Sequence, residues 1–123
     1  MKIVKHVFYK ATNKDLKIYD RKGQIMNGVH DVVVISNQTK DGYVKVKTIT
    51  SLENVDKYGN KTFHNASYEK IRDGKIIPIP QKLLNSDKFN GIYQVSICIH
   101  KSKLFQTDKK YKFPLLYDKI ISK

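Results

Sequence analysis

Two strand-like runs around a polar turn constrain the fold of this chain more than any other feature. The run DVVVIS (31–36) has four consecutive apolar, β-branched residues, which predicts a strand covered on both faces. The run YVKVKTIT (43–50) alternates, so its even-numbered residues face the core and Thr50 ends that row. The segment NQTKDG (37–42) between them consists of turn residues. Together they predict a β-hairpin at the centre of the core.

The rest of the chain has short strand and helix signals with no alternation of strands and long helices. Further strands are expected at residues 2–10, 75–80 and 92–99, the second at a sheet edge because it holds two prolines. Short helices are expected at residues 65–74, 80–91 and after Pro114, and residues 13–28 are expected to be mostly a long loop. This pattern predicts a mainly β protein, a small curved antiparallel sheet or barrel with short connecting helices, in which residues 1–123 form a single domain.

The charge of the chain indicates a polyanionic partner. The 123 residues include 24 Lys and Arg but only 11 Asp and Glu, for a formal net charge of +13. The positive charges are spread along the whole chain, so a folded domain attracts nucleic acid, or an acidic protein, through its field and through counterion release. A merely soluble, Lys-rich surface is the alternative interpretation.

Several function classes are not indicated. The single cysteine, Cys98, excludes an internal disulfide and a Cys-based zinc site, and the apolar run VSICI around it predicts a core position. The four histidines lack metal-site spacing, and there is no phosphate-binding loop, dinucleotide motif or serine nucleophile motif, so we expect no metal and no cofactor. No run approaches the roughly 20 apolar residues of a membrane span, and the N-terminus lacks signal-peptide character, which favours the cytoplasm and no membrane partner.

A chain this basic and this poor in carboxylates still permits one kind of catalysis. Cleavage of RNA without metal uses the 2′-hydroxyl of the substrate as nucleophile. The protein then supplies a base, an acid and a cation for the phosphate. Histidine transfers protons near neutral pH, Lys or Arg stabilises phosphate, and a Thr or Ser hydroxyl donates to a phosphate oxygen.

The segment GVHDVVVISNQTKDGYVKVKTITS (28–51) resembles the central hairpin of the MazF/PemK family of toxin ribonucleases. The family pattern has a Gly-containing loop, Arg-Pro, an apolar run such as VVVIS, a turn, and a second strand ending in Thr-Ser or Thr-Gly. Here the closing pair is Thr50-Ser51. The likeness extends more loosely over residues 1 to about 108. It implies an SH3-like antiparallel β-barrel of the MazF/PemK/CcdB type and a toxin endoribonuclease that cleaves single-stranded RNA without metal.

The resemblance places candidate catalytic residues at both ends of the hairpin. His30-Asp31 stands where the family has Arg-Pro, so His30 is a candidate acid or base rather than a permanent cation, with Asp31 as a possible partner of its ring. Thr50 and Ser51 are the candidate hydroxyl groups. Candidate RNA-binding residues are Arg21, Lys22, Lys45, Lys47, His100, Lys101 and Lys103.

The same resemblance implies two protein partners, a second copy of the chain in a homodimer and an acidic antitoxin segment that occupies the RNA groove. Two alternatives stay open at this point. One is a basic β-barrel that binds nucleic acid or a protein without cleaving anything. The other is a phage or plasmid accessory protein that inhibits a host factor.

Overall fold

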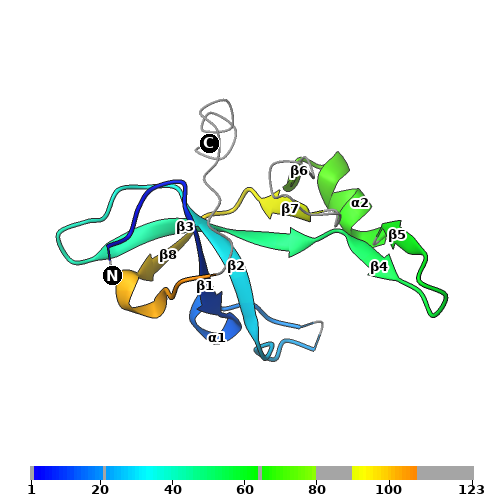
Figure 1. Cartoon of the computed structure of the whole chain (residues 1–123), viewed down its shortest axis with the longest axis horizontal. Coiled ribbons are helices and arrows are strands. Elements are labelled where there is room, and N and C mark those ends of the chain that lie inside the picture. The colour runs from blue at the N-terminus through cyan, green and yellow to red at the C-terminus, as the bar shows by residue number, and fades with distance from the viewer. Residues whose placement is uncertain (1, 21, 64, 80–89, 108–123) are drawn as a thin grey trace.

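The computed structural model describes residues 2–20, 22–63, 65–79 and 90–107, and this part of the chain is mainly β (Figure 1). One antiparallel sheet has the strand order β1-β2-β3-β7-β6, with β8 also paired to β3, and β4 and β5 form a separate hairpin. The strands are β1 (Phe8–Thr12), β2 (Val29–Val34), β3 (Tyr43–Ser51), β4 (Glu53–Val55), β5 (Lys61–Phe63), β6 (Ile76–Ile79), β7 (Asn90–Tyr93) and β8 (Ile97–His100). The helices are α1 (Asn13–Leu16), α2 (Asn65–Arg72) and the 3-10 helix Lys101–Lys103.

The hairpin predicted from the sequence is present, and its second strand organises the sheet. β3 pairs with β2 along one edge, with Val32 opposite Thr48 and Val34 opposite Val46. Its other edge pairs with β8 near the start of the strand and with β7 near its end (Figure 1). Because one long strand serves three partners, the side chains along β3 connect the two halves of the sheet.

The core lies on both faces of β2, as its unbroken apolar run predicts. Val32 and Val34 belong to one buried cluster, together with Val44 and Val46 of β3. Val33 belongs to a second cluster on the opposite face, which also contains Phe8, Ile49, Ile79 and Ile92. The expectation that the even-numbered positions of β3 face a core is confirmed for Val44 and Val46.

Two expectations about burial are wrong. Lys47 was expected on the outward face of β3, but this side chain is 0% exposed because the second cluster covers that face at the middle of the strand. Its Nζ donates to Oε1 of Gln94 at 3.4 Å, and burial lowers its pKa. Cys98 was expected in the core but is exposed, because the alternation of β8 turns the neighbouring Ile99 inward instead.

The single strand expected at residues 92–99 is two strands. Ile92 of β7 pairs with Ile49, whereas Ile97 of β8 pairs with Val46, so four residues, 93–96, lie opposite two residues of β3. The extra length forms a bulge whose Val95 is 72% exposed. The insertion of two residues keeps the alternation of faces, so Ile92 joins the second core cluster and Ile97, five positions further on, packs against the first.

The described strands form an antiparallel sheet that is not closed into a barrel, so the expectation of a barrel is met only at the level of a mainly β, antiparallel fold. One isolated bridge does join the segment after the 3-10 helix to β1. The backbone N–H of Lys10 donates to the carbonyl of Phe105 at 2.9 Å, and the N–H of Phe105 donates back at 3.0 Å.

Several smaller expectations have definite outcomes. The helix expected at residues 65–74 is α2, and Gly74 follows it with φ 75°. The proline-containing strand is β6, at the end of the strand order as predicted. The first strand begins only at Phe8. The helical turn expected at 80–91 and the helix expected after Pro114 fall almost entirely outside the described residues. In the described part of the chain, no helix has both the length and the apolar character needed to cross a bilayer.

Gly91 of β7 lies where the sheet has no room for a side chain. A Cβ atom at this position would lie 2.5 Å from Cγ2 of Ile76 and 3.2 Å from both Cδ atoms of Leu52, and both neighbours are fully buried. We expect Gly91→Ala to lower the free energy of unfolding by about 1–3 kcal/mol, as overpacking in a core does. Chemical denaturation measures this, with the exposed Ser96→Ala as a control that should change it by less than about 0.5 kcal/mol. Equal stability of the two variants would contradict the close packing at Gly91.

Candidate active site

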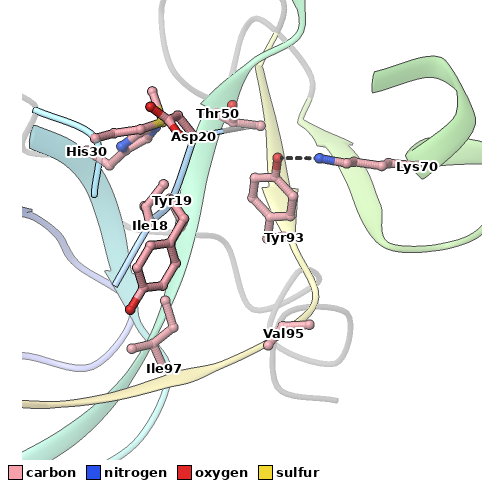
Figure 2. A pocket seen from close by; sticks show the side chains of 11 residues that line it. Ile18, Tyr19, Asp20, His30, Thr50, Lys70, Tyr93, Val95 and Ile97 are labelled. Atoms are coloured by element: carbon pink, nitrogen blue, oxygen red, sulfur yellow. Dashed lines mark hydrogen bonds between the residues drawn. The ribbon is translucent and has the colours of Figure 1, made fainter. Parts of the chain in front are cut away.

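A pocket opens beside the bulge between β7 and β8. Its volume of about 590 Å³ is within the range of small-ligand sites. Three parts of the chain line it: Ile18 to Asp20 with Met26 before β2, the start of β2 with the end of β3, and the bulge with its flanking residues. Lys70 of α2 adds a fourth wall. Figure 2 shows His30 on one side, Lys70 with Tyr93 on the other, and Thr50 between them.

His30 is held in the pocket by a hydrogen bond to Asn13, a partner that the sequence did not indicate. Nδ1 of His30 is hydrogen-bonded to Oδ1 of Asn13 at 2.5 Å. Asn13 is itself only 2% exposed, its Nδ2 donates to the carbonyl of Asn27 at 2.8 Å, and its backbone N–H donates to Gly28 at 2.9 Å. The short helix α1 thus positions a side chain that fixes the imidazole ring.

The hydrogen bonds of Asn13 also determine which nitrogen of His30 carries the proton. The carbonyl of Asn27 can only accept, so the Asn13 amide nitrogen faces it and the Asn13 oxygen faces His30. An amide oxygen can only accept as well, so Nδ1 of His30 carries a proton. In the neutral ring Nε2 then keeps its lone pair, which is the form that a general base requires.

Burial lowers the pKa of His30 below its ordinary value of 6.5, and the negative charge of Asp31 partly opposes this shift. The dominant cause is the loss of water around the imidazolium, since an uncharged ring is easier to bury. His30 is therefore mostly neutral at pH 7. A neutral ring with an unprotonated Nε2 in a pocket is suited to accept a proton from a ligand.

Two threonines of β3 lie on the same face as His30. Thr48 is opposite Val32 in the ladder, so the next positions outward on that face are His30 and Thr50. Thr48 and Thr50 both line the pocket, and Thr50 pairs through its backbone with Gly91 of β7. The two ends of the hairpin therefore meet at one site, and two hydroxyl groups are available there as donors to an anionic oxygen.

The opposite wall carries a cation bonded to a phenol. Nζ of Lys70 donates to the hydroxyl of Tyr93 at 3.1 Å, shown as a dashed line in Figure 2, and lies 5.1 Å from the centre of the same ring. Tyr93 is the last residue of β7, just before the bulge. A lysine paired in this way gives the pocket a positive charge together with an oriented O–H group.

The remaining candidates from the sequence lie elsewhere. His100 uses both ring nitrogens: Nε2 bonds the carbonyl of Asp41 at 3.0 Å, and Nδ1 accepts from the backbone N–H of Ser102 at 3.2 Å, which caps the 3-10 helix. Ser51 is exposed, and its Oγ accepts from the N–H of Glu53 at 3.5 Å. Arg21 lies outside the described residues. The other lysines predicted to bind RNA are exposed and lie outside the pocket lining: Lys22, Lys45, Lys101 and Lys103.

The sequence interpretation missed Asn13, Thr48, Lys70 and Tyr93. Thr48 had a usable signal, because it shares the core-facing row of β3 with Thr50. Asn13, Lys70 and Tyr93 had none, because each meets its partner only through folding. Within the described ranges, no three His, Cys, Asp or Glu side chains gather closely enough to hold a metal ion.

Asn13→Asp tests the arrangement around His30. A carboxylate in place of the amide favours the imidazolium, so we expect the pKa of His30 to rise, by about 1–3 units if the pair stays in contact. The carbonyl of Asn27 loses its donor, which costs about 1–3 kcal/mol of stability. Titration of the His30 ring protons by NMR measures the shift. An unchanged pKa of His30 would show that Asn13 does not contact the ring in solution.

No protein-family model matches this chain, and no curated protein sequence does.

Proposed function

We propose that this protein is a metal-independent endoribonuclease that acts on single-stranded RNA. The observation that supports this most is the pocket itself. It brings together a neutral His30 oriented by Asn13, the hydroxyls of Thr48 and Thr50, and the Lys70–Tyr93 pair. A base, donors for an anionic oxygen and a cation are the groups that cleavage by a 2′-hydroxyl needs.

In the proposed reaction, Nε2 of His30 removes the proton from a ribose 2′-hydroxyl, whose oxygen attacks the adjacent phosphorus. The bond to the 5′-oxygen of the next nucleotide breaks, and that oxygen takes a proton from Tyr93. Lys70 and the threonine hydroxyls stabilise the negative charge on the phosphate oxygens as it grows. The products are a 2′,3′-cyclic phosphate and a 5′-hydroxyl end.

The resemblance to the MazF/PemK toxins is part of this proposal. The β2–β3 hairpin and the bridge between Lys10 and Phe105 support an SH3-like arrangement. The family pattern has an arginine where this chain has His30, and in the proposed mechanism Lys70 supplies the positive charge that His30 lacks. A toxin role, a homodimer and an acidic antitoxin that competes with RNA remain proposals that follow from the resemblance.

The direct test incubates the purified protein with a long single-stranded RNA in the presence of a chelator. We expect fragments with cyclic phosphate ends, and no cleavage of a DNA strand of the same sequence, since DNA lacks the nucleophile. Tight binding of RNA without any cleavage would refute the nuclease and favour the non-catalytic binding module.

Binding of single strands should depend steeply on salt, because the chain has a net charge of +13 and most lysines of the described residues are exposed. We expect log affinity to fall with log salt concentration at a slope of about −0.7 per phosphate contact. Fluorescence anisotropy with a labelled deoxy-oligonucleotide, which cannot be cleaved, measures this. An affinity that is the same at low and high salt would show that the positive charge of the protein does not drive binding of the nucleic acid.

A further inference from the structure

One wall of the pocket is a small hairpin whose carboxylate has a defined orientation. Tyr19 pairs with Ile25, and the backbone N–H of Met26 donates to Ile18 at 3.0 Å. At its tip, Oδ1 of Asp20 accepts from the backbone N–H groups of Lys22 at 2.8 Å and Gln24 at 3.0 Å. These two donors occupy Oδ1, so Oδ2 is the oxygen that remains available to a ligand.

Asp20 lies in the lining beside apolar side chains. Ile18, Tyr19 and Met26 of the same hairpin line the pocket with it, and Val95 of the bulge lies on the opposite side. Tyr19 is 55% exposed and Met26 and Val95 are exposed as well, so apolar side chains are open to solvent in the same lining as the Asp20 carboxylate. Aromatic and apolar walls with a few polar groups are how proteins hold an unpaired base.

We propose that this hairpin selects the base next to the cleaved phosphate, and that the base is guanine; this inference rests on the proposed nuclease function. A carboxylate oxygen only accepts hydrogen bonds, and it repels carbonyl oxygens. Guanine presents N1–H and the N2 amino group side by side, so both can point at Oδ2 of Asp20. The pairing edges of uracil, cytosine and adenine each place an acceptor directly beside their donor, which weakens the same contact.

Asp20→Asn reverses the polarity at one atom. The amide oxygen can keep the two backbone donors of the turn, which leaves the NH₂ group where Oδ2 was, now facing the donors of guanine. The chain offers a matched control, because Asp56 accepts from the backbone N–H groups two and four residues further on, as Asp20 does. Oδ1 of Asp56 accepts from Tyr58 and Asn60, both at 2.8 Å, at the tip of the β4–β5 hairpin and outside the pocket lining. Asp56→Asn therefore reports what the substitution does to such a turn alone.

The experiment measures binding of deoxythymidine hexamers that carry one central guanine, one central hypoxanthine or neither. The wild-type protein and Asp56→Asn should bind the guanine strand about tenfold more tightly than the all-thymine strand. Hypoxanthine, which lacks the N2 amino group, should bind with intermediate affinity. In Asp20→Asn the preference for guanine should vanish or reverse towards thymine, whose carbonyl oxygens accept from the new NH₂ group.

Equal binding of the three strands by the wild type, or a guanine preference that survives in Asp20→Asn, would overturn the inference. Mapping of RNA cleavage sites separates this result from the nuclease proposal. Cleavage at all bases alike would remove the guanine selection and leave the nuclease standing. Guanine-selective binding without cleavage would support the base selection and refute the nuclease.

Discussion

Replacing His30 with alanine should reduce the rate of RNA cleavage by about 10²–10⁴-fold, the usual contribution of a general base. The expected loss follows from the position of His30, which is the histidine of the pocket lining and has Nδ1 occupied by Asn13. Initial rates on a fluorogenic RNA measure the effect, and thermal unfolding confirms that the variant is folded. Because the substitution leaves Oδ1 of the buried Asn13 without its donor, we expect it to cost about 1–3 kcal/mol of stability.

The pH profile of the wild type gives a second readout of His30. A general base works in its unprotonated form, and burial lowers the pKa of this ring below 6.5. The rate should therefore rise with pH through a value below 6.5 and become flat above it. In His30→Ala this rise should disappear. A rise centred well above 6.5 would assign the base to another group.

His100→Ala is the matched control for His30→Ala. His100 is a structural residue that caps the 3-10 helix, so its loss should cost about 0.5–2 kcal/mol of stability and leave the cleavage rate of the folded protein unchanged. Thr50→Ala should also slow cleavage, and the double variant with His30→Ala should be no worse than the poorer single variant if the two act as one unit. Full activity of His30→Ala would eliminate the proposed mechanism.

Replacing Lys70 with methionine should reduce the rate of the chemical step by about 10²–10³-fold. The change keeps the length of the side chain and removes the charge, along with the hydrogen bond to Tyr93. Removing one donor that stabilises the charge of a transition state typically has an effect of this size. Single-turnover cleavage with saturating enzyme measures the chemical step separately from RNA binding.

Lys75→Met is the control for the general loss of one positive charge. Lys75 is exposed just after α2 and lies outside the pocket lining. This variant should weaken RNA binding slightly and leave the single-turnover rate unchanged. If Lys70→Met and Lys75→Met behave alike, Lys70 acts only through the overall charge of the surface and has no role in the transition state.

The sequence by itself determined the central hairpin. The unbroken run of β2 and the alternation of β3 are local patterns, and each specifies which side chains turn inward regardless of the rest of the chain. That is why the burial of Val32, Val33 and Val34 on two faces follows from the sequence, and why His30 and Thr50 could be expected at the ends of neighbouring strands. The edge position of β6 follows equally from its proline, which cannot donate to a ladder.

Only the tertiary structure decided which groups complete the pocket. Asn13 and His30 are 17 residues apart, and Lys70 and Tyr93 are 23 apart, so no local pattern relates either pair. The bulge between Tyr93 and Ile97 arises because β3 pairs with two strands in different registers, and it opens the wall that Tyr93 and Val95 line. The burial of Lys47 has the same origin, since the cluster that covers it is built from β1, β6 and β7 as well as its own hairpin. Such contacts depend on how distant segments meet, and a pattern of neighbouring residues carries no record of that.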